Sequence, residues 1–157
     1  MLVSDILKHF SSEQLHNMVG AYLLGFGLNE KDLTYPNIIP ATGEEGFGHT
    51  ISFNSVMTPE ATWPIVYNDA VTAINPVNWR TDDEPATLIF YDDTLSVRLD
   101  TTLHELIVTV PDPEPYHEFM NSNPAYQMAG VSPDCLHRWD LLFYSKQIHD
   151  NILRRNR

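Results

Sequence analysis

The segment Leu95-Ser96-Val97-Arg98-Leu99-Asp100 alternates strictly between apolar and polar side chains. Successive side chains of a strand point to opposite faces, so this alternation predicts a half-buried strand of an antiparallel sheet. Residues 86–91 and 106–110 are also predicted to be strands. The Asp92-Asp93 and Asp100-Thr101-Thr102 segments between these strands are typical of hairpin turns. The region therefore predicts a β-meander in which neighbouring strands pair antiparallel.

Helical patterns lie on both sides of this region. Apolar residues at helical spacing favour a helical segment within residues 1–27, where Ser11 and Gln14 resemble a capping box. Ser132-Pro133-Asp134 is typical of a helix start and predicts a long C-terminal helix over residues 132–153. A chain of 157 residues fits a single domain. We expect an α+β fold over residues 1–157, with an antiparallel sheet of about 4–5 strands in residues 49–110.

Charge is divided unevenly along the chain. Residues 32–134 hold sixteen carboxylates and two basic residues, a balance of −14, residues 1–31 carry −1 and residues 135–157 carry +3, which sum to −12. An acidic body repels phosphate, so we expect it not to bind nucleic acid directly. The chain shows no signal-peptide pattern and no apolar run near the roughly 20 residues of a membrane span. We expect no membrane partner, and a location in the cytoplasm or in a virion assembled in a host cytoplasm.

The residues that could carry chemistry do not form a catalytic or cofactor motif. His104-Glu105 and His117-Glu118 lack the second histidine of the zinc-protease helix. Cys135 is the single cysteine, so it forms no internal disulfide, and we expect it to be buried and unreactive. The glycine-rich loop of residues 43–48 has two glutamates and no lysine, which favours a mobile or partner-contacting loop over a phosphate site. We expect a protein that is not an enzyme and needs no cofactor or metal.

The predicted C-terminal helix indicates a protein–protein interface. Four consecutive apolar residues, Leu141 to Tyr144, point all round a helix, and arginines follow at the end of the chain. We expect the chain to act as a structural or assembly subunit, either as a homo-oligomer or in a larger assembly such as a phage neck, tail or baseplate. The candidate interface residues are Trp139, Leu141, Leu142, Phe143, Tyr144, Arg154, Arg155 and Arg157.

Two alternatives stay open from the sequence. The acidic body would suit an anti-defence protein that mimics nucleic acid and inhibits a host nuclease or polymerase. Its candidate acidic surface consists of Asp82, Asp83, Glu84, Asp92 and Asp93. A metal-dependent hydrolase would instead use Asp92, Asp93 and His104. Aspartates that form turns are the simpler interpretation of these acids.

Overall fold

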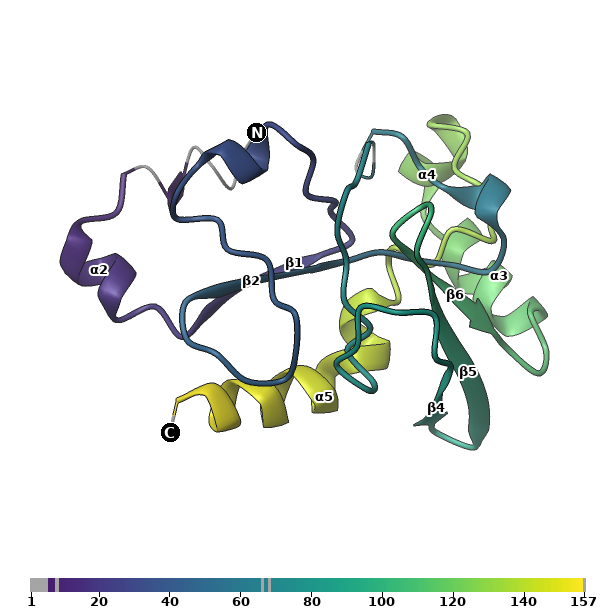
Figure 1. Cartoon of the computed structure of the whole chain (residues 1–157). Helices are drawn as coiled ribbons and strands as arrows, with labels where there is room; N and C mark the ends of the chain where they lie inside the picture. Colours follow the sequence, from purple (N-terminus) through teal and green to yellow (C-terminus); the bar gives the residue numbers. More distant parts are fainter. Residues whose placement is uncertain (1–5, 8, 66, 68, 157) are drawn as a thin grey trace.

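The computed structural model describes residues 6–7, 9–65, 67 and 69–156, and has an α+β fold with two sheets and a long C-terminal helix (Figure 1). The four-stranded sheet has the strand order β3-β6-β5-β4, and the two-stranded sheet pairs β1 with β2. The elements in chain order are α2 (Ser12–His16), β1 (Gly20–Leu24), η1 (Asp32–Thr34), β2 (His49–Phe53), β3 (Ser55–Val56), η2 (Pro59–Ala61), β4 (Ala86–Phe90), β5 (Asp93–Asp100), β6 (Glu105–Thr109), α3 (Glu114–Asn121), α4 (Pro124–Met128) and α5 (Asp140–Arg155).

Strands β4, β5 and β6 form the predicted antiparallel meander. The alternation in β5 is confirmed, because Leu95, Val97 and Leu99 are buried while Ser96 is exposed. Asp100 forms the turn after β5, and its Oδ1 accepts hydrogen bonds from the backbone N–H groups of Thr102 (2.9 Å) and Leu103 (3.1 Å). The prediction of a single antiparallel sheet is corrected, since β3 joins β6 in parallel and β1–β2 is a separate parallel pair.

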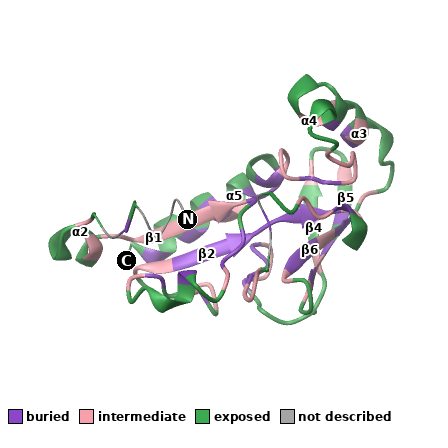
Figure 2. Ribbon diagram, turned by 90° about the horizontal axis from the view of Figure 1, so that it is seen from above, coloured by how far each residue is buried: buried purple, intermediate pink, exposed green. Residues whose placement is uncertain are grey.

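The segment from β2 to β3 connects the two sheets through the middle of the molecule. Every residue from Thr50 to Val56 is buried, and Figure 2 shows this purple path running between the sheets. The polar side chains of the segment are covered as well. Ser52 Oγ donates a hydrogen bond to the Phe26 carbonyl (2.7 Å), and Asn54 Nδ2 donates to Glu105 Oε1 (2.8 Å). These hydrogen bonds satisfy the two donor groups in place of water, which allows Ser52 and Asn54 to lie in the interior.

The expected helical segment over residues 1–27 is corrected to a short helix followed by a strand. The capping box at Ser11 and Gln14 is confirmed, but α2 ends at His16, and β1 pairs with β2 in parallel. The apolar run suits a strand as well, because Tyr22 and Leu24 of β1 pack against the main core while Leu23 packs against a second cluster with Leu28 and Ile38. Gly20 argues against the helix, since glycine inside a helix costs about 1 kcal/mol relative to alanine. Residues 1–5 lie outside the described part of the chain.

The predicted start of the C-terminal helix is also corrected, from residue 132 to Asp140. Ser132, Pro133 and Asp134 form a turn, after which the backbone pairs with the edge of β3. The Asp134 carbonyl accepts from Met57 N–H (2.8 Å), and Leu136 N–H donates to the Ser55 carbonyl (2.9 Å). Pairing with an unfilled strand edge satisfies these backbone groups, so the tertiary contact overrides the local helix signal.

Candidate functional site

Helix α5, which carries most of the predicted interface, has two different faces. Its inner face is buried against the sheets, where the Phe53 and Tyr144 rings meet edge to face at 5.2 Å between centroids. Tyr144 OH and Ser55 Oγ lie 3.0 Å apart in a hydrogen bond. Phe143 and Tyr144 are buried within this chain, which corrects their assignment as interface candidates. A helix that packs in a core needs apolar residues on this face without any partner.

The outer face of α5 remains exposed. Leu141 is 58% exposed, Leu142 45% and Leu153 52%. Ser145, Lys146 and His149 lie between these leucines along the same face and are also exposed. At 1.5 Å per residue, the face extends about 18 Å from Leu141 to Leu153. The structure therefore leaves leucine side chains in solvent at both ends of one helix face.

Trp139 is half-buried and belongs to an aromatic cluster at the start of α5. Its ring stacks on the Phe143 ring, with 5.4 Å between centroids and 16° between planes. Phe90 from β4 meets both rings edge to face, and Tyr116 and Phe119 from α3 complete the cluster. The cluster joins α3, α5 and the β4–β5 hairpin, so Trp139 contributes to the fold of this chain.

The C-terminal arginines hold the glycine-rich loop of residues 43–48. Arg155 is buried, and its guanidinium donates to the carbonyls of Gly43 (2.6 Å) and Gly46 (2.5 Å) and to Asn151 Oδ1 (2.7 Å). Arg154 Nε lies 3.1 Å from Glu44 Oε1. The assignment of Arg155 as an interface candidate is corrected, because its donors are used by the loop and by Asn151, whereas the exposed Arg154 stays a candidate. Arg157 lies outside the described residues.

The five acidic surface candidates lie in two separate groups. Asp82 forms an ion pair with Arg80 just before β4, and Asp83 and Glu84 are exposed beside it. At the other end of β4, Asp92 lies in the turn and Asp93 is the first residue of β5, where its Oδ2 accepts a hydrogen bond from Tyr116 OH (2.6 Å). The five residues of β4 separate the groups by roughly 15 Å. Duplex DNA carries one charge per about 1.7 Å of its axis, a density that these two groups do not reproduce.

The residues of the hydrolase alternative are not brought together. Asp92 and Asp93 lie at the turn before β5, and His104 lies at the turn after it. The eight residues of β5 hold the two turns roughly 20 Å apart. A single metal ion with ligand bonds of about 2 Å cannot bridge that distance, so this set of residues is excluded as a catalytic centre.

Sequence reasoning missed two carboxyl groups inside the fold. Glu105 is fully buried, and it accepts hydrogen bonds from Asn54 and Thr62. Asp140 is 1% exposed, and neither of its carboxylate oxygens makes a well-formed hydrogen bond with a described group, although the hydroxyl and N–H of nearby Ser55 partly offset its burial. Burial raises the pKa of both carboxyl groups, and the effect is strongest for Asp140. No local pattern marks either residue, because their burial results from segments that are distant in sequence.

Cys135 and His137 lie near these acids but do not form a nucleophilic pair. Cys135 is buried, as expected, and burial raises the pKa of its thiol to about 11. A thiol with that pKa is almost wholly protonated at neutral pH and is a poor nucleophile. Burial also lowers the pKa of His137, whose Nδ1 lies 3.9 Å from Asp140 Oδ2. Among the described residues, no group of three or more His, Cys, Asp or Glu is arranged to hold a metal ion.

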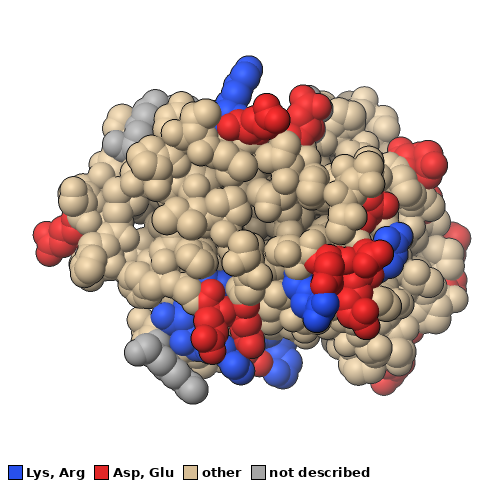
Figure 3. Space-filling model, viewed as in Figure 1, with Lys and Arg blue, Asp and Glu red and all other residues tan. Residues whose placement is uncertain are grey.

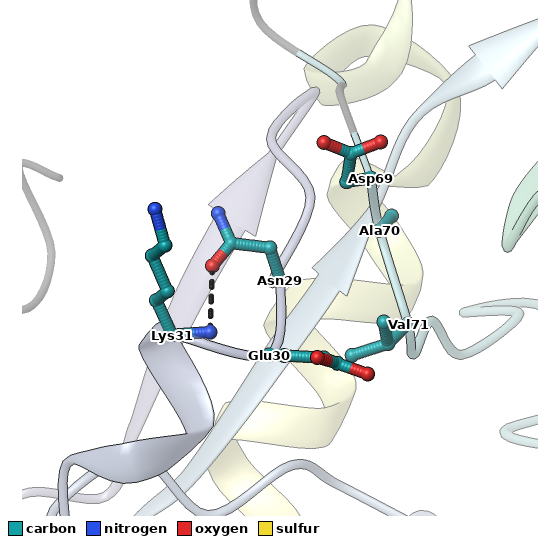
Figure 4. Close-up of a pocket in the computed structure, with 6 residues that line it drawn as sticks. All are labelled: Asn29, Glu30, Lys31, Asp69, Ala70 and Val71. Atoms are coloured by element: carbon teal, nitrogen blue, oxygen red, sulfur yellow. Dashed lines mark hydrogen bonds between the residues drawn. The ribbon is translucent and has the colours of Figure 1, made fainter.

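A shallow surface hollow of about 480 Å³ lies between the segments of residues 29–31 and 69–71 (Figure 4). Its lining comes from two segments, and Figure 4 shows Lys31 on one side and Asp69 on the other. Asn29 Oδ1 accepts a hydrogen bond from Lys31 N–H (3.0 Å), which folds the lysine segment into a turn. The lining residues are Asn29, Glu30, Lys31, Asp69, Ala70 and Val71. They supply no nucleophile paired with a base.

Comparison with known proteins finds no matching family model, no matching curated protein and no matching solved structure. None of the helices that the structure describes is long and apolar enough to cross a membrane.

Proposed function

We propose that the protein is a non-enzymatic structural or assembly subunit that associates with a second copy of itself through the outer face of α5. The observation that carries the proposal is the placement of exposed leucines at both ends of this face. Leu142 lies at one end and Leu153 at the other, with polar residues between them. Burial of such side chains between two chains would supply the free energy of association.

The outer face of α5 is complementary to itself when two helices run antiparallel. If Leu142 contacts Leu153 of the second copy, two-fold symmetry also brings Leu153 against Leu142 of the second copy. In this register Lys146, which forms an ion pair with Asp150 of its own chain, lies opposite His149 of the second copy, so no like charges meet at the centre of the contact. A two-fold interface requires this self-complementarity, because each surface meets its own copy.

The proposed interface is small. Stable complexes bury about 1,200–2,000 Å² of surface. Each helix face is only about 18 Å long, so the area buried between two of them would be smaller than that. We therefore expect a weak dimer that dissociates on dilution. In a larger assembly, several such weak contacts would act together. Apolar contacts would set the affinity, and the match of Leu142 with Leu153 at both ends would favour the antiparallel orientation.

Sedimentation equilibrium over a range of protein concentrations tests the proposal. The mass should rise from 17.9 kDa towards twice that value as concentration increases. Leu142→Glu should keep the chain at 17.9 kDa by placing a charge in the contact. Leu33→Glu is the matched control, since Leu33 is 38% exposed on η1, away from α5, and this variant should associate normally.

Two results would contradict the proposal. The first is a wild-type chain that stays monomeric at every concentration reached. The second is an equal loss of association in Leu142→Glu and Leu33→Glu, which would indicate a general effect of added charge rather than a contact through α5.

A further inference from the structure

Strand β4 forms an edge of the four-stranded sheet, and no strand formed by the described residues pairs with its outer side (Figure 1). It pairs with β5 alone, with Phe90 opposite Asp93 and Ala86 opposite Val97. Ile89 is 66% exposed, and Tyr91 in the following turn is 86% exposed. Among the described residues, no backbone group of β4 bonds outside the β4–β5 ladder. An open edge of this kind is a template for a further strand.

The register of the hairpin shows which groups of β4 face outward. The two strands are joined by a two-residue turn, Tyr91-Asp92, so the closing pair Phe90–Asp93 exchanges backbone hydrogen bonds. Such pairs alternate along an antiparallel ladder, and Leu88 therefore also bonds to β5. The N–H and C=O groups of Thr87 and Ile89 point away from β5. These four groups are available to an added strand.

Acidic side chains flank the open edge at both ends. Asp83 and Glu84 precede β4, next to the Arg80–Asp82 ion pair, and Asp92 follows it. In Figure 3 the end of the molecule that contains β4 to β6 carries mostly acidic side chains, while basic ones gather near the C-terminal end of α5. A strand lying on β4 would meet negative charge at each of its ends.

A second copy of β4 does not fit this edge. Only an antiparallel register centred on Leu88 pairs all five residues of β4 with a second β4. That register places Glu84 opposite Asp92 of the second copy at both ends of the strand. Like charges directly opposite one another destabilise a strand pair, and acidic side chains flanking an edge protect a sheet from self-association.

We propose that β4 is a docking edge that takes up an extended, basic segment of a different protein as an additional strand of the sheet. The segment would pair its backbone with Thr87 and Ile89, place an apolar side chain against Ile89, and carry lysine or arginine at both ends. Addition of a strand to a sheet edge is a general mode of peptide recognition. This surface is separate from the outer face of α5, so the proposal does not depend on self-association.

Peptide binding tests the proposal directly. The probe is a fluorescein-labelled peptide of alternating valine and threonine with two lysines at each end. We expect fluorescence anisotropy at low ionic strength to show binding at least about tenfold tighter than for the same core with two glutamates at each end. Added salt should weaken the binding of the lysine peptide, because salt screens the flanking charges.

Two matched changes separate strand addition from simple charge attraction. N-methylation of the core amides of the lysine peptide keeps its charge and removes the hydrogen bonds to β4, so binding should be lost. The protein variant Glu84→Lys/Asp92→Lys should reverse the preference and favour the glutamate peptide. Both residues are exposed, so a circular dichroism spectrum and melting temperature like those of the wild type are expected for this variant.

The outcomes distinguish this proposal from self-association. Binding of the lysine peptide by the Leu142→Glu variant with unchanged affinity would support an independent docking edge. Equal binding of the lysine and glutamate peptides, full binding of the N-methylated peptide, or no binding of the lysine peptide at millimolar concentration would each overturn the proposal. None of these results affects the mass measurement that tests α5.

Discussion

The inner and outer faces of α5 are built from adjacent residues, yet they differ in environment. Phe143 is 3% exposed and Tyr144 is fully buried, whereas Leu141 and Leu142 are 58% and 45% exposed. The inner face also holds polar groups, since Asn151 accepts a hydrogen bond from Tyr22 OH (2.7 Å) and Arg155 binds the glycine-rich loop. The outer face has leucines at its ends and polar residues between them.

This contrast shows that hydrophobicity alone does not distinguish a core from an interface. Four apolar residues in a row indicate that a helix is covered on more than one side. Two of the four are covered by the chain itself, and the other two remain exposed. Substitutions on the inner face should therefore lower the free energy of unfolding, and those on the outer face should affect association.

The largest effect on stability is expected from Tyr144→Ala. Removing this buried ring leaves a cavity beside Phe53 and should lower the free energy of unfolding by about 3–5 kcal/mol. Tyr144→Phe keeps the ring and removes only the hydroxyl that pairs with Ser55, for a loss of about 1 kcal/mol. Urea unfolding followed by circular dichroism measures both. A loss in Tyr144→Ala no larger than that in Tyr144→Phe would show that the ring does not carry the packing.

A smaller loss of stability is expected when the hydrogen bonds between Arg155 and the glycine-rich loop are removed. Arg155→Met removes the donors to the Gly43 and Gly46 carbonyls and should cost about 1–3 kcal/mol in the free energy of unfolding. Arg154→Ala is the control, since an exposed ion pair with Glu44 contributes about 0–1 kcal/mol. Amide hydrogen exchange should rise in residues 43–48 of Arg155→Met only. Unchanged protection there would show that the loop is held by other contacts.

Asp140→Asn should stabilise the protein at neutral pH and change its pH dependence. Burial raises the pKa of Asp140 in the folded state, because the protonated carboxyl is favoured in the interior. The contribution of this group to the free energy of unfolding is therefore fully present below the pKa of about 4 that it has in the unfolded chain. That stability is lost as pH rises through the folded-state pKa. Asparagine resembles the protonated acid, so the variant should gain on the order of 1 kcal/mol at pH 7. Its stability should fall less steeply above pH 4 in urea titrations at several pH values.

Glu105 contributes to the same pH dependence in the same direction, because burial raises its pKa as well. The Asp140→Asn variant should therefore retain part of the fall in stability with rising pH. A variant that is less stable than the wild type at pH 7, with an unchanged pH profile, would indicate that Asp140 is charged in the fold and held by a partner.

The smallest effect on stability is expected from Leu142→Glu on the outer face. Surface substitutions usually change the free energy of unfolding by at most about 0.5 kcal/mol. At a protein concentration where sedimentation gives the mass of a single chain for both proteins, the melting temperature should match that of the wild type. A large destabilisation in the monomer would show that the outer face supports the fold instead of a partner.

Local signals predicted the elements whose partners are close in sequence. The alternation in β5 and the aspartates at its two turns define a meander between adjacent strands, and the Ser11–Gln14 capping box begins α2 as expected. Predictions were wrong where contacts with segments distant in sequence determine the secondary structure. Residues 20–24 become a strand because β2 lies beside them, and residues 134–136 leave the helix because β3 offers an open edge.

The candidate sites show the same division. The sequence indicated the C-terminal helix as a candidate interface but could not separate its faces, since four consecutive apolar residues point all round a helix. It placed Asp92 and His104 in one hypothetical centre, although β5 holds them at opposite ends. The sequence did not predict the open edge of β4. The strand order of the sheet depends on which segments pair, and no local pattern shows which strand lies at the edge.

The sequence by itself determined the α+β class, the meander and the uneven charge, because these follow from side-chain periodicity and composition. Only the tertiary structure decided that Arg155 closes the glycine-rich loop, that Asp140 and Glu105 are buried, and that the outer face of α5 and the edge of β4 remain open. The physical reason is that burial and pairing depend on segments brought together from far apart in the chain. Local preferences are worth tenths of a kcal/mol, whereas such contacts contribute several kcal/mol and therefore determine the structure.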